Sequence, residues 1–126
     1  MSHWAERLMM KNHLPRLVYA GPIGVRRDWH RWNHNFCRFP ASCVYHLFGA
    51  DGEVVYIGKT NCPLYRFEKH SRKPWWSEVA HLNLYVISCE SHADEPCTYR
   101  LDSVAMHWEM KAIRDLQPPQ NVVGVA

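Results

Sequence analysis

The 126-residue sequence predicts one α/β (α+β) domain. Two apolar, aromatic runs flank an Asp-Gly pair, which is typical of a β-hairpin, and a third strand-like run follows later. Apolar residues near the C-terminus recur with helical spacing. A chain of this length can bury a single core. No apolar run approaches the roughly 18 residues that a membrane span needs, so no membrane partner is expected.

Residues 1–40 are expected to form a basic, aromatic N-terminal extension to a domain over residues 41–126. The first part contains seven Lys or Arg against two Asp or Glu, a net charge of +5, whereas the rest carries −2. Charge separated in this way favours a polyanionic partner. Taken alone, however, the charge fits a basic solvated surface better.

Two helices are predicted within the extension. Residues 2–14 fit a short amphipathic helix that Pro15 ends, and residues 21–24 have the glycine and proline content of a turn. The aromatic residues of 29–36 then recur at helical spacing and predict a second helix.

The hairpin is the clearest local prediction. Residues 43–48 and 53–57 are the two apolar runs, and residues 51–52 between them are Asp-Gly. If the strands pair around this turn, Tyr45 and Tyr56 lie close to opposite each other, with both rings on one face of the sheet. Tyr is also common in ordinary strands, so either side chain alone indicates little.

A helix and a third strand follow the hairpin. Thr60 or Asn61 can cap a helix that has Pro63 in its first turn and ends before Pro74. Residues 82–89 alternate enough to predict a strand.

The last predicted element is a helix over about residues 95–116, capped by Asp94 and stopped by two prolines. Glu109 lies on the shoulder of its apolar stripe. A carboxylate turned toward a core costs several kcal/mol unless it is paired or binds a metal. The stripe consists of Leu101, Val104, Ala105, Trp108, Ala112 and Leu116.

Two further patterns bear on phosphate binding. Arg66 and His70 are four residues apart on the predicted helix and would share a face, where the planar fork of an Arg can clamp a phosphate. Taken alone, however, the pair fits a surface Arg with a solvated His better. Gly-Lys-Thr at 58–60 is not a triphosphate loop, because five strand-like residues, not four, separate it from Gly52. No nucleotide cofactor is therefore expected.

The cysteine content indicates a reducing compartment, and the cysteine and histidine residues together leave zinc binding possible. Five irregularly spaced Cys residues favour reduced thiols over a secreted disulfide framework. Glu6, Arg7 and Lys11 interrupt any signal core, so an intracellular (cytoplasmic) protein is expected. Two groups could hold zinc, although neither has a familiar spacing. They are His30, His34, Cys37 and Cys43, and Cys89, His92 and Cys97.

The combined pattern resembles the GIY-YIG nuclease family. Arg66 lies ten residues after the Tyr of the second motif, Tyr56-Ile57-Gly58, and His70 follows four residues later. Glu109 on a later helix and Asn121 complete the set, with spacing similar to the N-terminal nuclease domain of excision-repair endonucleases. The match covers about residues 42–123. The first motif departs from the family, because Cys43-Val44-Tyr45 replaces its Gly and Ile.

The resemblance implies a small three-stranded antiparallel sheet flanked by helices, and hydrolysis of DNA phosphodiester bonds with Mg²⁺ or Mn²⁺. Glu109 would bind the metal and Arg66 would neutralise the phosphate. Tyr45 would orient or deprotonate the attacking water and His70 would tune or relay its proton, while Tyr56 would position water or phosphate.

Other residues are expected to support this site. Gly58 and Lys59 would shape it, and Asn121 would hold the region of Glu109 by hydrogen bonds. The aromatic residues of 29–36 would either stack on unpaired bases or fill a core. The residues expected to bind DNA are Lys59, Arg26, Arg27 and Arg31.

Two other functions fit parts of the pattern: a DNA-binding module that has lost its activity, and an unrelated zinc-stabilised protein. The resemblance is compatible with restriction, repair, homing and mobile-element roles. Because one active site cuts one strand, double-strand cleavage would require a homodimer or two visits.

Overall fold

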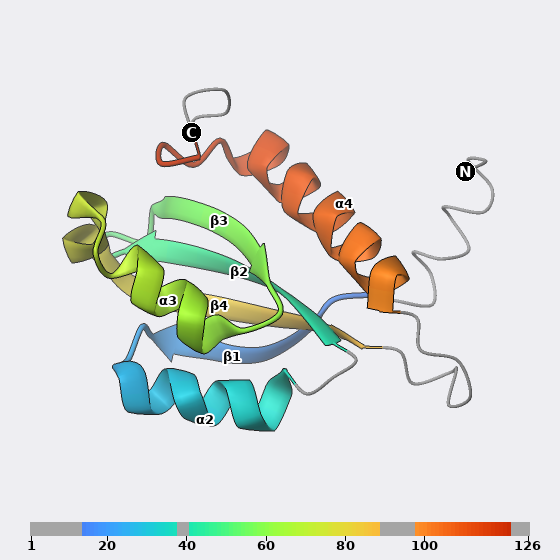
Figure 1. The fold of residues 1–126 in the computed structure, drawn as a ribbon. Helices are drawn as coiled ribbons and strands as arrows, with labels where there is room; N and C mark the ends of the chain where they lie inside the picture. Colours follow the sequence, from blue (N-terminus) through green and yellow to red (C-terminus); the bar gives the residue numbers. More distant parts are fainter. Residues whose placement is uncertain (1–13, 38–40, 89–97, 122–126) are drawn as a thin grey trace.

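The structure is a computed structural model that describes residues 14–37, 41–88 and 98–121. Four antiparallel strands form one sheet in the order β1-β4-β2-β3. Figure 1 shows this sheet with helices on both sides. The elements are β1 (Arg16–Pro22), α2 (Arg26–Phe36), β2 (Ala41–Gly49), β3 (Val54–Thr60), α3 (Pro63–His70), the short 3₁₀ helix η1 (Pro74–Glu78), β4 (Val79–Ser88) and α4 (Thr98–Leu116).

The α+β class is confirmed, but the expected three-stranded sheet is wrong by one strand. β1 pairs with β4, so that Leu17 lies opposite Tyr85. Local pattern did not reveal β1, because it is a short run that ends in Gly-Pro and is half exposed. Its hydrogen-bond partners lie on β4, far along the chain, and only the folded sheet brings the two together.

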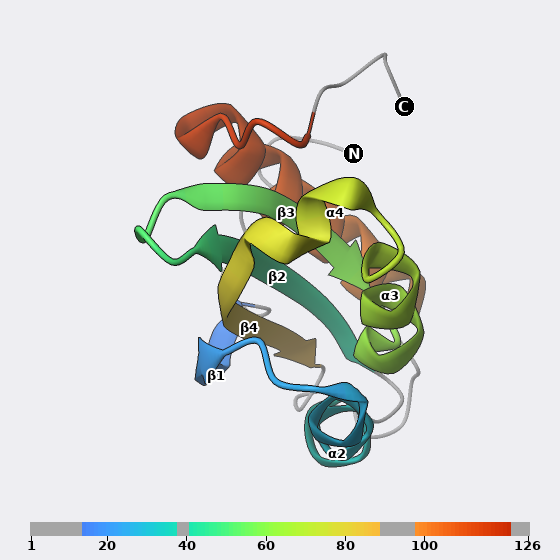
Figure 2. The ribbon, with the colours of Figure 1, turned by 90° about the vertical axis from the view of Figure 1, so that its left-hand side faces the viewer.

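The sheet separates two apolar clusters. The helices α2 and α3, with η1, cover one face, and α4 covers the other, as Figures 1 and 2 show. Tyr45 belongs to the cluster under α2 and α3, while its neighbour Val44 belongs to the cluster under α4. This alternation is the normal consequence of a pleated strand.

The described part of the predicted extension, residues 14–37, shares this sheet and core. The helix expected over the aromatic residues is α2, where Trp29 and Trp32 are only 6% and 3% exposed. The ring of Trp29 meets Phe67 of α3 edge-on at 5.8 Å and Trp76 of η1 at 5.7 Å. These two tryptophans therefore fill the core and are not available to stack on bases. The predicted helix over residues 2–14 lies outside the described residues except for Leu14, which is not helical.

Most other predicted elements are observed with shifted ends. The hairpin is β2 and β3, with Gly52 at φ +84° in its turn, and the third predicted strand is β4. The N-cap of α3 is Cys62, not Thr60 or Asn61; the Thr60 hydroxyl instead accepts a hydrogen bond from the Cys62 backbone N–H at 2.9 Å. Asp94, the predicted cap of the last helix, is not among the described residues.

The apolar stripe of α4 is buried at its first residues, half-buried at Trp108 and Ala112, and exposed at its end. Leu101, Val104 and Ala105 are buried against β2 and β3. Leu116, the last helical residue, is 48% exposed, because it borders a pocket between α4 and the sheet. Among the described helices, none is both long and apolar enough to cross a membrane.

Candidate active site

The two candidate tyrosines share one face of the hairpin. Tyr45 pairs with Gly58, and Tyr56 pairs with Leu47, so the tyrosines are diagonal neighbours and not directly opposite. Their rings lie 6.1 Å apart and 26° from parallel. The expectation of a common face is therefore confirmed.

Gly58 makes room for this pair of rings. A Cβ atom at position 58 would lie 2.5 Å from Cζ of Tyr45 and 2.9 Å from Cε1 of Tyr56. Both distances are far below van der Waals contact. The glycine of the second motif is therefore needed because the aromatic rings fold over its backbone.

The Tyr45 hydroxyl joins the hairpin to α3. It lies 2.7 Å from Nε2 of His70, and Nε of Arg66 donates to it at 3.1 Å. Because the oxygen accepts from Arg66, its own hydrogen is available to His70, the only other partner found within the described chain. The arrangement favours a Tyr45 hydroxyl that donates to Nε2 of a neutral His70.

Burial sets the charge state of this pair. Tyr45 has no exposed surface and His70 is 5% exposed. Burial lowers the pKa of His70 to about 4, assisted by the positive charges of Arg66, Lys73 and Lys69. Burial and Tyr56 raise the pKa of Tyr45 against the opposing effect of Arg66. At neutral pH the pair therefore consists of an uncharged phenol and an uncharged imidazole.

Arg66 is the cation of the site. Burial lowers the pKa of its guanidinium, but the hydroxyls of Tyr45 and Tyr56 outweigh this effect and the pKa is raised overall. The side chain is half-buried, so part of the guanidinium remains open to a ligand.

Glu109 brings a carboxylate to the same cluster from α4. Burial raises its pKa, while the charges of Lys59 and Arg66 and a hydrogen bond from the Lys59 backbone N–H lower it. Its charge also acts on Tyr45. None of the ion pairs found within the described part of the chain involves Glu109.

Asn121 and Glu109 both form hydrogen bonds with backbone groups on the outer edge of β3. The Asn121 carboxamide accepts from the Ile57 N–H and donates to the Ile57 carbonyl, each at 2.7 Å. The Gln120 N–H donates to the Val55 carbonyl at 3.1 Å. Val55, Ile57 and Lys59 alternate along the strand, so their backbone groups face the same edge. Asn121 thus bonds to β3 itself, and it supports Glu109 by tying the chain after α4 to this strand.

The donor set fits a hard divalent cation. Mg²⁺ commonly uses one or two protein carboxylates and completes its shell with water and phosphate oxygens. A half-buried carboxylate without an ion pair meets that need. No group of three or more His, Cys, Asp or Glu residues among the described ones could hold a metal by itself.

Only the first predicted zinc group lies within the described residues, and its four side chains do not form a metal site there. His30 and His34 are exposed on α2, whereas Cys37 and Cys43 are buried thiols. The second group, Cys89, His92 and Cys97, lies outside the described residues.

The predicted DNA-binding arginines of α2 differ in their partners. Arg26 forms an ion pair with Glu68 of α3, and Arg31 pairs with Asp28 at 3.1 Å. Arg27 is exposed and takes part in none of the ion pairs found in the described segments. Lys59 lies in the cluster itself, beside Glu109.

Sequence reasoning overlooked Trp75. Its ring stacks on Tyr56 at 5.2 Å and 15°, and it lies 5.2 Å from the ring of His70. A signal existed, since Pro74-Trp75-Trp76 directly follows the helix that carries Arg66 and His70.

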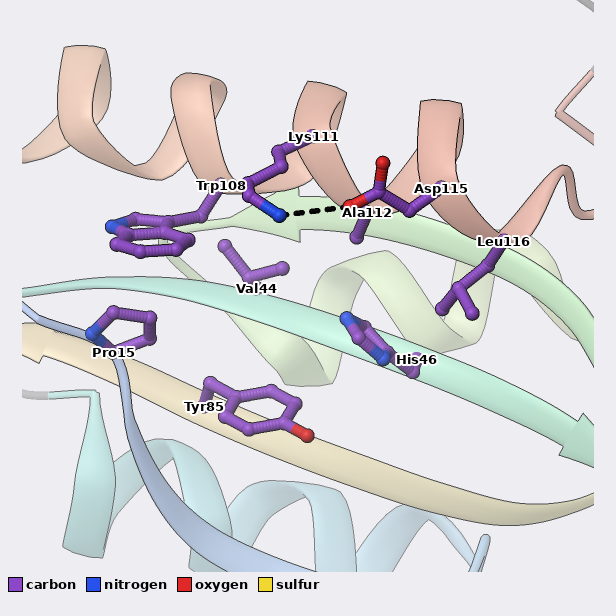
Figure 3. A pocket seen from close by; sticks show the side chains of 9 residues that line it. All are labelled: Pro15, Val44, His46, Tyr85, Trp108, Lys111, Ala112, Asp115 and Leu116. Carbon is purple, nitrogen blue, oxygen red and sulfur yellow. Dashed lines mark hydrogen bonds and ion pairs between the residues drawn. The ribbon is translucent and has the colours of Figure 1, made fainter.

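A separate pocket lies on the opposite face of the sheet. It has a volume of about 310 Å³ and is bounded by β2, β4 and α4 (Figure 3). Val44, His46 and Tyr85 form its floor, and the ion pair of Lys111 and Asp115, at 2.8 Å, lies at its rim. Because Val44 and Tyr45 point to opposite faces, this pocket is not part of the cluster around Tyr45.

Comparison of the chain with protein-family models, curated proteins and solved structures returned no match.

Proposed function

We propose that the protein is a divalent-metal-dependent DNA endonuclease of the GIY-YIG type, which hydrolyses phosphodiester bonds. The observation that carries this proposal is the convergence of Tyr45, Arg66, His70 and Glu109 on one cluster. These side chains come from β2, α3 and α4. They supply a hydroxyl, a fixed cation, a proton acceptor and a metal-binding carboxylate, the groups that phosphodiester hydrolysis needs.

Tyr45 acts on the attacking water and His70 takes the proton. His70 can accept this proton through Nε2, because its lowered pKa keeps it neutral at physiological pH. A phenol is a poor base by itself, and burial makes Tyr45 weaker still as an acid. The positive charge of Arg66 beside the oxygen opposes that effect, and a cation at Glu109 would add to it.

Glu109 would hold the metal. When bound, Mg²⁺ or Mn²⁺ polarises the scissile phosphate and stabilises the leaving oxygen. Lys59 lies next to Glu109 and contributes a further positive charge on the side that the phosphate approaches.

Arg66 links the substrate phosphate to Tyr45. In the free protein Arg66 donates to the Tyr45 oxygen, and Tyr45 has no exposed surface. A phosphate is a stronger partner for a guanidinium than a neutral phenol. The open part of the guanidinium can bind the phosphate while Nε continues to donate to Tyr45, so the positive charge stays beside the phenol oxygen.

Cleavage of supercoiled plasmid tests the proposal. Wild-type protein is incubated with Mg²⁺, Mn²⁺ or EDTA, and nicked and linear products are measured over time. We expect metal-dependent nicking that EDTA abolishes. Arg66→Ala should reduce the rate by about 10²–10³, and Arg66→Lys by less. Arg114→Ala, which removes an exposed arginine from α4, is the matched control and should cleave normally.

The experiment also separates the alternatives. DNA binding without cleavage under any metal would favour a binding module that has lost its activity. If the folded protein neither binds nor cleaves DNA, a nuclease function is excluded.

A further inference from the structure

The two tryptophans of η1 have different environments. Trp76 points into the core, where it meets Trp29 at 5.7 Å and Phe67 at 6.4 Å. Trp75 instead lies against Tyr56 and His70, at 5.2 Å from each ring. Trp76 therefore anchors η1, and Trp75 covers the phenol–imidazole pair.

The covered rings form one continuous stack. Tyr56 lies between Trp75 and Tyr45, nearly parallel to both, and its ring is 4.7 Å from that of His70. Nδ1 of His70 is buried and finds no hydrogen-bond partner in the described part of the chain. The orientation of the imidazole is thus held by one hydrogen bond, to Tyr45, and by ring packing.

We propose that Trp75 is a positioning residue for the hydrolytic reaction, which holds the His70 imidazole against the Tyr45 hydroxyl and keeps water away from both. Its effect on catalysis rests on the proposed function. Its effect on His70 does not, and it can be measured without any DNA.

The surroundings of His70 define what the loss of Trp75 would change. The groups that face His70 are the hydroxyl of Tyr45 from β2, Tyr56 from β3, the cations Arg66 and Lys69 from α3, Lys73 after α3, and Trp75 from η1. No carboxylate is among the groups that shift the pKa of His70. Removing the indole admits water, whereas the cations remain.

An NMR titration of the His70 imidazole tests this positioning role directly. The signal is assigned by its loss in His70→Gln and is followed in wild type, Trp75→Ala and Trp75→Phe. The pKa of His70 should rise from about 4 by about 1 unit or more in Trp75→Ala, toward the ordinary value of about 6.5. Trp75→Phe retains an aromatic ring, so its His70 pKa should lie close to the wild-type value.

Trp108→Ala is the matched control. Trp108 is also a partly buried tryptophan, but it belongs to α4 and packs against the apolar cluster on the opposite face of the sheet. This variant should lose thermal stability without moving the His70 titration. An unmoved His70 titration in folded Trp75→Ala, or equal movement in Trp108→Ala, would overturn the proposal.

The pH dependence of plasmid cleavage gives a second readout. Because cleavage needs neutral His70, its acid limb should move to higher pH in Trp75→Ala, in step with the NMR titration, and return in Trp75→Phe. An acid limb that stays in place while the His70 pKa moves would show that Trp75 does not act through His70. If the wild-type protein does not cleave DNA at all, the proposed function fails, whereas the titration still decides whether Trp75 controls His70.

Discussion

The Tyr45 hydroxyl lies 2.7 Å from Nε2 of His70, although the two residues occupy different elements of the fold. A third side chain, Arg66, donates to the same oxygen. This contact joins the two residues that the resemblance expects to act on the same proton. It also predicts that the two tyrosines of the site are not equivalent.

Tyr45→Phe should therefore be more damaging than Tyr56→Phe. Loss of the Tyr45 hydroxyl leaves Nε2 of His70 without its partner in a buried site, at a cost of about 1–3 kcal/mol in the free energy of unfolding. It also removes the group that acts on water, so cleavage should be nearly abolished. Tyr56→Phe keeps the ring stack with Trp75 and should be impaired less. Single-turnover cleavage and urea unfolding measure both effects, and normal cleavage by both variants would reduce the tyrosines to ordinary strand residues.

Glu109→Gln should abolish cleavage while DNA binding persists. Burial raises the pKa of the Glu109 carboxyl above its ordinary value of 4.5, so folding favours the protonated form. The stabilising contribution of Glu109 is then full below pH 4.5 and is lost as the pH rises through the pKa in the folded protein. Without metal, the glutamine variant should become more stable than wild type as the pH increases from 4.5 to 7.

Thermal unfolding across this pH range, with and without Mg²⁺, checks the assignment of Glu109. Mg²⁺ should raise the melting temperature of wild type but not of Glu109→Gln. Undiminished cleavage by the variant would exclude Glu109 as the metal ligand.

Gly58→Ala should destabilise the fold and the site together. The added methyl group would meet the rings of Tyr45 and Tyr56, and overpacking of this kind typically costs about 1–3 kcal/mol. Gly49→Ala in β2 is the control, because the nearest atom there is the exposed carboxylate of Asp51, which can move. Urea unfolding should separate the two variants; equal stability would mean that the rings can shift at little cost.

Replacing the α2 arginines should weaken DNA binding and flatten its salt dependence. Each lost phosphate contact lowers the log–log slope by about 0.9 on duplex DNA. Arg27→Ala tests the α2 arginine for which the described segments show no ion pair, and the triple variant adds Arg26 and Arg31. Lys111→Ala on α4 is the control. An unchanged salt-dependence slope in the folded triple variant would mean that α2 contributes only to the core, where its Trp29 is buried.

The salt slope matters because α2 also has a structural task. The ion pair of Arg26 with Glu68 joins α2 to α3, the helix that carries Arg66 and His70. Exposed pairs of this kind contribute little to stability, about 0–1 kcal/mol, and can exchange partners. Arg26 is therefore available to DNA without a large cost to the fold.

The sequence by itself determined the parts of this protein that depend on neighbours along the chain. Asp-Gly between two apolar runs specified the hairpin. The alternation of side chains along its two paired strands placed Tyr45 and Tyr56 on one face. The helical period of α4 turned Glu109 toward the sheet. In each case the interactions that decide the outcome lie within a few residues, so the local pattern contains the information.

Only the tertiary structure decided which side chains meet. β1 became a strand because β4 supplied its hydrogen bonds, and Asn121 found its partner in the open edge of β3. Trp29 and Trp75 are both aromatic residues in basic surroundings, yet one fills the core and the other covers His70. Burial and hydrogen-bond pairing between distant segments arise from the packed arrangement of the whole chain, and no local periodicity records them.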